Sequence, residues 1–227
     1  MYKLYIANKN YSSWSLRGWL CMKLAGAPFE EIHAPLAGMG ANPAFLAFSP
    51  SGLVPCLHDG NVVVWESLAI AEYLAERHAG LWPDEPKARA FARSIVSEMH
   101  AGFRDLRNDM TMCIRERVDV RPWSDGLGKD IDRVQALWSQ ARSGYGRGGS
   151  YLFGRFSIAD AFFAPVAFRF QTYDVAPDGA AGEYWRSLLS HPLLREWEAA
   201  ALKESAVVDA DEPRQIYREK LQALGRL

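Results

Sequence analysis

The sequence predicts an α/β fold over residues 1–80, followed by an all-helical region over residues 87–227. Strand-like and helix-like patterns alternate in the first part, whereas only helical periodicity follows it. Between the two parts, 81–86 carries two prolines and no periodicity, so we expect the domain boundary there. A chain of 227 residues is long enough to bury a substantial core.

The first part combines two kinds of strand connection. The expected elements are, in order, a strand at 3–7, a helix at 14–25, a strand at 30–35, strands at 53–58 and 62–65, and a helix at 67–78. Asp59-Gly60 between the last two strands is a strong hairpin signal. The order β-α-β-(α)-β-β-α joins a parallel unit to an antiparallel hairpin, which is the thioredoxin-like arrangement.

Apolar stripes at helical spacing fill the second part. One stripe about six turns long predicts a single core-facing helix and contains Phe91, Ile95, Met99, Phe103, Leu106, Met110 and Cys113. A second stripe contains Ile131, Val134, Trp138 and Ala141. We expect loops at 121–129 and 144–150, and a helix boundary at Pro192.

Charge and composition exclude several classes of function. The formal net charge of -1 provides no basic field for nucleic acid or an anionic membrane. No stretch approaches the roughly 18 apolar residues that span a bilayer. The first six residues read as a strand and not as a secretion signal, so we expect a cytoplasmic protein. Cys21, Cys56 and Cys113 lie far apart and predict no metal site.

A cluster of hydroxyls lies where the first strand leads into the first helix, at Asn10-Tyr11-Ser12-Ser13-Trp14-Ser15-Leu16-Arg17. A helix cap explains one of these serines. A hydroxyl at a helix N-terminus also meets the positive end of the helix dipole, where it can donate a hydrogen bond to an anion. Both interpretations are open from this motif alone.

Two further motifs flank the predicted hairpin. Val54-Pro55 precedes it, and a cis bond there would turn the Val54 backbone outward, although trans is the default. Glu66-Ser67 follows it, where Ser67 can cap a helix whose free N–H groups suit a carboxylate, and Glu66 could receive an ammonium group. A cap beside an ordinary surface carboxylate is the simpler alternative.

Ser157-Ile158-Ala159-Asp160 forms a capping box with Asp in place of the more usual Glu. We interpret it as structural, because it precedes an apolar helix through Phe162, Phe163 and Val166.

The order and spacing of these motifs resemble the cytosolic glutathione transferase family over nearly the whole chain. The resemblance implies a cis Val54-Pro55 bond, with Val54 pairing with the cysteinyl backbone of glutathione. It also implies that Glu66 and Ser67 hold the γ-glutamyl end, and that a hydroxyl near the start of the first helix contacts the sulfur. Glutathione is then the cosubstrate, no metal is needed, and a homodimer is expected.

Serine in the sulfur-contacting position is similar to the serine-type classes, with a zeta- or theta-like motif. A zeta-like alignment on Arg17 favours Ser12, whereas a delta-like alignment favours Ser13, which we prefer. Tyr11 could serve instead if the loop is displaced. Trp14 occupies the position of the zeta-class cysteine, which weakens an isomerase assignment.

The predicted reaction is attack by the glutathione thiolate on an apolar electrophile. Lowering a thiol pKa by about 2 units requires about 2.7 kcal/mol, which one charge-assisted hydrogen bond and a helix dipole can supply. The resemblance places the electrophile in an apolar cleft between the domains, and the candidates for its lining are Tyr11, Met99, Phe103, Arg107 and Trp123. The alternatives are a non-catalytic binding or regulatory module on this fold, a thiol-disulfide enzyme, and a zeta-like isomerase or a dehalogenase.

Overall fold

The computed structural model describes residues 1–36 and 40–226. Its N-terminal part contains, in order, β1 (Tyr2–Ile6), α1 (Ser13–Ala25), β2 (Phe29–His33), the 3-10 helix η1 (Pro43–Ala47), β3 (Cys56–Asp59), β4 (Val62–Trp65) and α2 (Ser67–Ala75). The strands form one sheet in the order β2-β1-β3-β4. β1 pairs in parallel with β2 and antiparallel with β3, and β3 pairs antiparallel with β4. The predicted thioredoxin-like arrangement is therefore confirmed.

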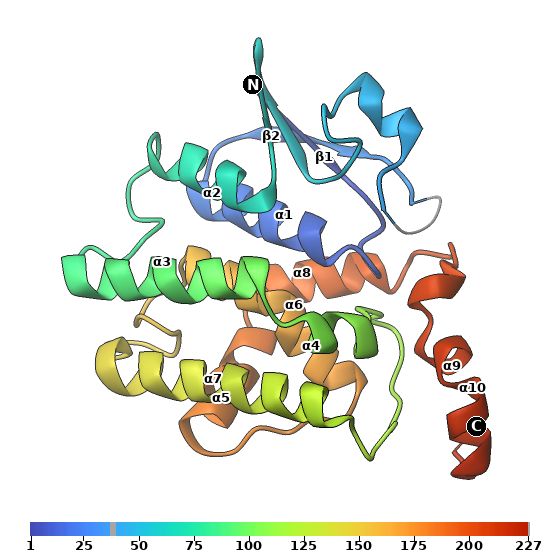
Figure 1. Cartoon of the computed structure of the whole chain (residues 1–227). Helices are drawn as coiled ribbons and strands as arrows, with labels where there is room; N and C mark the ends of the chain where they lie inside the picture. Colours follow the sequence, from blue (N-terminus) through green and yellow to red (C-terminus); the bar gives the residue numbers. More distant parts are fainter. Residues whose placement is uncertain (37–39, 227) are drawn as a thin grey trace.

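The second part is all-helical, as predicted. It contains α3 (Pro86–Ala101), α4 (Arg104–Asp109), α5 (Asp125–Tyr145), α6 (Ile158–Thr172), α7 (Gly179–Leu189), α8 (Pro192–Ala201), the 3-10 helix η2 (Asp209–Asp211), α9 (Pro213–Ile216) and α10 (Arg218–Ala223). α1 and α2 lie between the sheet and these helices (Figure 1), and α1 packs against α6. The N-terminus of α1 therefore lies where the two parts meet.

The long helix expected across the first apolar stripe is wrong, because it breaks at Gly102 and Phe103. Phe103 has a left-handed φ of 61°, and a side chain on Gly102 would place its Cβ 2.9 Å from the Glu98 carbonyl oxygen. Arg107 caps the broken end by donating to the carbonyls of Met99 and Gly102. A helix C-terminus leaves such carbonyls without partners. Arg107 supplies the missing donors and so stabilises the break, and the break in turn positions Arg107.

The loop expected at 121–129 ends earlier than predicted. α5 begins at Asp125, where the Ser124 hydroxyl accepts a hydrogen bond from the Leu127 N–H at 3.2 Å. Gly126 lies within this helix and faces α4, since a Cβ there would be 2.2 Å from an Asp105 carboxylate oxygen. Here the glycine permits close packing of α4 and does not mark a loop.

The predicted capping box is present at the start of α6. The Asp160 carboxylate accepts hydrogen bonds from the Ser157 N–H at 2.8 Å and from the Leu152 N–H at 3.1 Å. α6 is buried along almost its whole length, so it forms the centre of the helical part. No helix within 1–36 or 40–226 is long and apolar enough to cross a membrane.

Candidate active site

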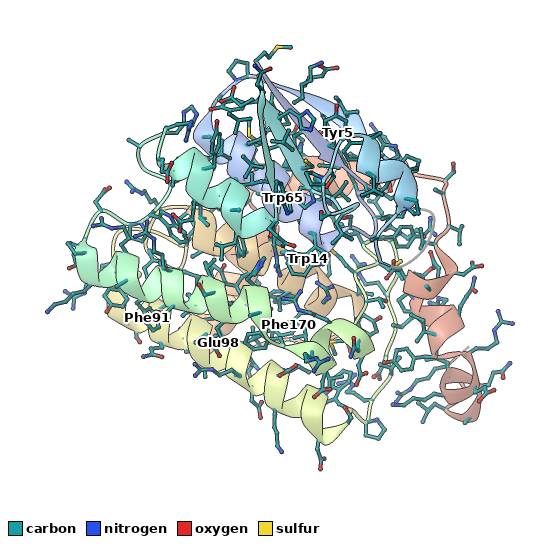
Figure 2. The ribbon with its side chains drawn as sticks, turned by 45° about the horizontal axis from the view of Figure 1, so that its top comes forward. Tyr5, Trp14, Trp65, Phe91, Glu98 and Phe170 are labelled. Carbon is teal, nitrogen blue, oxygen red and sulfur yellow. The ribbon has the colours of Figure 1, made fainter. Side chains whose placement is uncertain are left out.

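A cavity of about 370 Å³ opens between β3, α2 and the end of α3. We call it the first cavity, and its lining residues are Trp14, Leu53, Val54, Pro55, Glu66, Ser67, His100 and Ala101. Figure 2 shows Trp14 between the α/β part and the helices below it. Four residues that the resemblance assigns to glutathione, Val54, Pro55, Glu66 and Ser67, therefore share one cavity.

The Val54-Pro55 peptide bond is cis. Gly18 of α1 allows Pro55 to pack directly on that helix, because a Cβ on Gly18 would lie 2.9 Å from the proline ring. Among the described residues, neither the N–H nor the C=O of Val54 has a hydrogen-bond partner. Unpaired backbone groups beside a cavity can bind a ligand with an extended backbone.

Glu66 and Ser67 form the far end of the first cavity. Glu66 has φ 70° and ψ 126°, a backbone conformation that costs a side-chain-bearing residue about 1–3 kcal/mol. Its carboxylate lies 3.6 Å from Nε2 of His100. The Ser67 hydroxyl is fully buried and has no hydrogen-bond partner in the structure. The first turn of α2 contains no acidic side chain, so its free N–H groups keep their positive potential.

A second cavity of about 270 Å³ adjoins the first and shares Trp14, Leu53 and Val54 with it. Its remaining lining residues are Tyr11, Ser12, Ser13, Leu36, Gly40, Phe45, Arg107, Asn108, Thr111, Met112, Arg169 and Asp211. These residues come from the start of α1, from α4 and α6, and from the C-terminal segment. The lining of the second cavity thus contains residues from both parts of the chain.

The two serines at the start of α1 have different partners. Ser12 is the N-cap, since its hydroxyl accepts from the Ser15 N–H and donates to the Ser15 hydroxyl at 2.7 Å. The Ser13 hydroxyl accepts from the Arg169 guanidinium at 3.4 Å, and its own proton has no acceptor among the described residues. Ser13 is therefore free to donate to a ligand, whereas Ser12 stabilises the helix.

Tyr11 lines the second cavity, but its hydroxyl has other partners. It donates to the Glu212 carboxylate and accepts from the Arg115 guanidinium. Burial, followed by the hydrogen bond to Glu212, raises the pKa of Tyr11 to about 12. This hydroxyl helps to hold the C-terminal segment and is not free to contact a thiol.

The C-terminal segment, 203–226, closes one side of the second cavity. The Glu204 carboxylate accepts hydrogen bonds from the N–H groups of Lys9, at 2.7 Å, and Asn10, at 3.1 Å. The Tyr217 hydroxyl donates to the Asp109 carbonyl at 2.6 Å. These bonds connect the segment to both parts of the fold and bring Asp211 into the cavity wall.

Of the helical residues expected around the electrophile, only Arg107 lines a cavity described here. Met99 is completely buried in the helical core, and Phe103 packs into the same core from the break after α3. Trp123 lies half-buried before α5, with its ring under the Arg121 guanidinium. None of these three side chains lines the first or the second cavity.

The sequence analysis missed His100, Arg169 and Asp211, and it assigned no ligand role to Trp14. His100 lines the first cavity, and burial, followed by repulsion from Arg17, lowers its pKa. Arg169 could have been found, because it is a charged residue between Phe168 and Phe170 in a largely apolar helix. Asp211 belongs to a segment without periodicity, so nothing local indicated its position.

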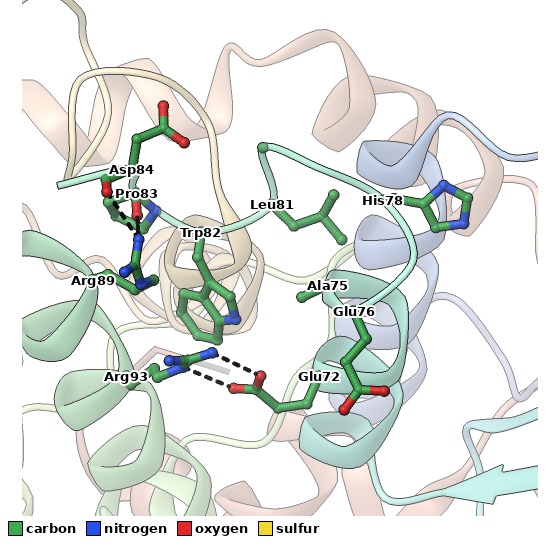
Figure 3. Close-up of a pocket in the computed structure, with 11 residues that line it drawn as sticks. Glu72, Ala75, Glu76, His78, Leu81, Trp82, Pro83, Asp84, Arg89 and Arg93 are labelled. Carbon is green, nitrogen blue, oxygen red and sulfur yellow. Dashed lines mark hydrogen bonds and ion pairs between the residues drawn. The ribbon is translucent and has the colours of Figure 1, made fainter. Parts of the chain in front are cut away.

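A third hollow lies between α2 and the linker before α3 (Figure 3). Its charged side chains have partners close by: Arg93 pairs with Glu72 at 3.2 Å, and Arg89 donates to the Asp84 carbonyl at 2.9 Å. These bonds join the two parts of the fold. Nε1 of Trp82 is buried there without a hydrogen-bond partner among the described residues, whereas these charged groups are paired.

Comparison with known families agrees with this geometry. The model for the N-terminal domain of glutathione S-transferases matches residues 11–77, and the model for the C-terminal domain matches residues 114–200. Together the two matches cover well over half of the chain. The chain belongs to the glutathione S-transferase family.

Individual relatives are similar to this chain in sequence and in fold. The chain is 27% identical to a maleylacetoacetate isomerase of Pseudomonas aeruginosa over 189 residues, which cover 78% of this chain and 84% of that protein. A glutathione transferase homolog from Burkholderia, solved with bound glutathione, superposes with a TM-score of 0.66 at 21% identity, over 89% of this chain and 98% of that one. A theta-class enzyme from Xanthomonas axonopodis pv. citri, also with glutathione bound, gives a TM-score of 0.64 at 23% identity, over 90% and 99%. The two solved structures support the fold described above for this chain.

Proposed function

We propose that this protein is a glutathione transferase that binds glutathione in the first cavity and ionises its thiol at Ser13. The observation that carries the proposal is the buried, unpartnered hydroxyl of Ser67 at the N-terminus of α2. A buried hydroxyl without a partner costs about 1–3 kcal/mol, which a ligand that supplies the partner recovers. A carboxylate satisfies both this hydroxyl and the free N–H groups of the helix.

The proposed positions of the other groups of glutathione follow from this contact with the carboxylate. The γ-glutamyl carboxylate binds at Ser67, and its ammonium group pairs with the Glu66 carboxylate. The unpaired N–H and C=O of Val54 bond to the cysteinyl backbone. The thiol then reaches the junction of the two cavities, where the Ser13 hydroxyl donates a hydrogen bond to the thiolate.

Charge favours ionisation of the thiol at this point. The first turn of α1 contains no acidic side chain, so its dipole is not offset. The Arg169 guanidinium lies within hydrogen-bond distance of Ser13 and adds a positive charge. The thiolate electron pair forms the new bond to the electrophilic carbon, the leaving group departs with its own bonding pair, and the thiol proton passes to solvent.

Isomerisation is a second candidate, favoured by the similarity to a maleylacetoacetate isomerase. In that case the thiolate adds to a conjugated double bond, the resulting single bond rotates, and the thiolate is expelled again. Glutathione is consumed in conjugation and regenerated in isomerisation, so its concentration after many turnovers distinguishes the two reactions.

Calorimetric titration with glutathione tests the proposal. We expect the wild type to bind and Ser67→Ala to bind at least about tenfold more weakly, because a charged ligand loses a buried donor. Ser94→Ala is the matched control, since Ser94 is exposed on α3 and its hydroxyl donates to the Ala90 carbonyl. If the wild type does not bind glutathione at millimolar concentration, the protein is instead a binding module on this fold.

A further inference from the structure

Three arginines lie in or beside the wall of the second cavity, and none forms an ion pair with a carboxylate in the part of the chain that the structure describes. Arg107 and Arg169 line the second cavity, and the Arg107 guanidinium lies 4.8 Å from the Trp14 ring centre. Arg17 is completely buried, with its guanidinium 4.4 Å from the same ring. By contrast, the arginines of the hollow in Figure 3 have close partners.

The hydrogen bonds of these arginines are incomplete. Arg169 donates to the Met110 carbonyl at 2.6 Å and to Ser13, and Arg107 donates to the two carbonyls at the end of α3. The three nitrogens of the Arg17 guanidinium have no partner in the structure. Burial of a charge is costly unless the charge is paired. A group of such charges beside a cavity therefore indicates that an anion completes it.

Burial and mutual repulsion lower the pKa values of Arg17 and Arg169. Burial, followed by repulsion from Arg107, lowers the pKa of Arg169 to about 9. Burial, followed by repulsion from Arg107 and Arg169, lowers the pKa of Arg17 well below its ordinary value. Arg169 remains protonated at neutral pH, so the cavity keeps a positive potential.

A count of the lining side chains shows that the wall of the second cavity is positive. Arg107 and Arg169 contribute two positive charges to this wall. Asp211 is the one carboxylate among the lining residues that the structure describes. With Asp211 ionised, one positive charge of the wall has no side-chain carboxylate to compensate it.

We infer that the second substrate carries a carboxylate, which binds to Arg107 and Arg169 while its reactive carbon faces Ser13. This inference rests on the proposed function and narrows its substrate class, which the sequence predicted to be apolar. Guanidinium groups bind carboxylates through paired N–H donors. The apolar wall formed by Trp14, Phe45 and Met112 receives the hydrocarbon part of the substrate.

A matched pair of electrophiles tests the inference. Chloronitrobenzoate, with chlorine para to the carboxyl group, and its methyl ester undergo the same displacement of chloride by glutathione but differ in charge. We expect the wild type to prefer the acid by at least about tenfold in kcat/KM, relative to the uncatalysed rates. Arg107→Gln should remove most of this preference, which is read as the ratio of the kcat/KM values for acid and ester in the same variant. Arg133→Gln, on the surface of α5, is the matched control.

Two further measurements guard against trivial explanations. The Arg169→Lys variant guards against a folding defect, and a binding measurement guards against a change in turnover. Lysine retains the charge, so this variant should keep part of the preference even if Arg169→Gln does not fold. Calorimetry with chloronitrobenzoate alone should show binding that weakens in Arg107→Gln. This second readout does not require glutathione, so its failure is separate from failure of the proposed function.

Two outcomes overturn the inference. One is equal use of acid and ester by the wild type, or a preference that survives in Arg107→Gln. The other is a loss of glutathione affinity in Arg107→Gln that is absent for γ-glutamylcysteine. In that outcome the arginines bind the glycine carboxylate of glutathione and not the second substrate.

Discussion

The Arg169 guanidinium donates a hydrogen bond to the Ser13 hydroxyl across 3.4 Å, which connects α6 to the first turn of α1 over 156 residues of sequence. The bond leaves the Ser13 proton free and directs it away from the arginine. It also places a buried positive charge next to the hydroxyl that we expect to contact the thiolate. The helical part of the chain therefore contributes directly to the sulfur site of the N-terminal part.

Replacing each of the two serines should separate catalysis from helix capping. Ser13→Ala should bind glutathione, lose the ultraviolet absorbance of the bound thiolate, and react about tenfold more slowly or worse at neutral pH, because the thiol pKa rises. Ser12→Ala should keep the thiolate and lose about 1 kcal/mol of unfolding free energy, since it removes a helix cap. Loss of the thiolate in Ser12→Ala and its retention in Ser13→Ala would assign the roles the other way round.

The backbone of Glu66 allows its strain and its charge to be measured separately. Glu66→Ala keeps the free-energy cost of a residue with a side chain at φ 70°, whereas Glu66→Gly removes this cost. Both variants should bind glutathione more weakly, because both lose the carboxylate that pairs with the ammonium group. In urea denaturation, Glu66→Gly should be more stable than Glu66→Ala by about 1 kcal/mol. Equal stabilities would mean that Glu66→Ala relaxes to an ordinary backbone conformation.

Asp211 should make recognition of an anionic substrate depend on pH. Burial raises its pKa to about 6 and Glu212 acts in the same direction, whereas Arg169 acts against the shift. Above that pH the ionised carboxylate competes with the substrate for Arg169. The kcat/KM ratio of chloronitrobenzoate to its ester should therefore fall by up to about tenfold as the pH rises from about 5 to about 7. The ratio should be flat in Asp211→Asn, and an unchanged slope in that variant would assign the effect to another group.

Asp160 should destabilise the fold as the pH rises. Burial raises its pKa from 3.8 to about 6, so the native state holds the proton after the unfolded chain has released it. The stabilising contribution is complete below pH 3.8 and is lost as the pH rises through about 6. The unfolding free energy of the wild type, relative to Asp160→Asn, should fall by about 3 kcal/mol over this interval. Asp178→Asn, on the surface before α7, serves as the control, and a constant difference would contradict the expectation.

Much of the fold could be predicted because its signals are local. The hairpin after Asp59, the serines at the start of α1 and the capping box at Ser157 each depend on a few neighbouring residues. The break at Gly102 could not be predicted, because the apolar stripe continues across it and the left-handed Phe103 has no local signature. The start of α5 differs from the prediction, because Gly126 and Gly128 are typical of a loop but both lie in the helix that Ser124 caps.

The residues of the candidate site also fall into two groups, those that local motifs predict and those that only tertiary contacts bring together. Val54, Glu66 and Ser67 belong to short motifs whose order along the chain resembles a known family, and the structure places them around one cavity. Arg169 and Asp211 reach the second cavity only through contacts between segments far apart in sequence. The charge of that cavity could therefore not be predicted from composition or from any single motif.

The segment from Glu204 to Asp211 has a consequence for the order in which the two cavities are completed. A ribosome synthesises the N-terminal part first, and that part contains Ser13 and the residues that we propose to anchor glutathione. The wall that carries Asp211, together with the hydrogen bonds from the Lys9 and Asn10 backbone to Glu204, exists only after the residues of this segment have emerged. During translation, the residues proposed to bind glutathione are therefore made well before the wall proposed to select its reaction partner.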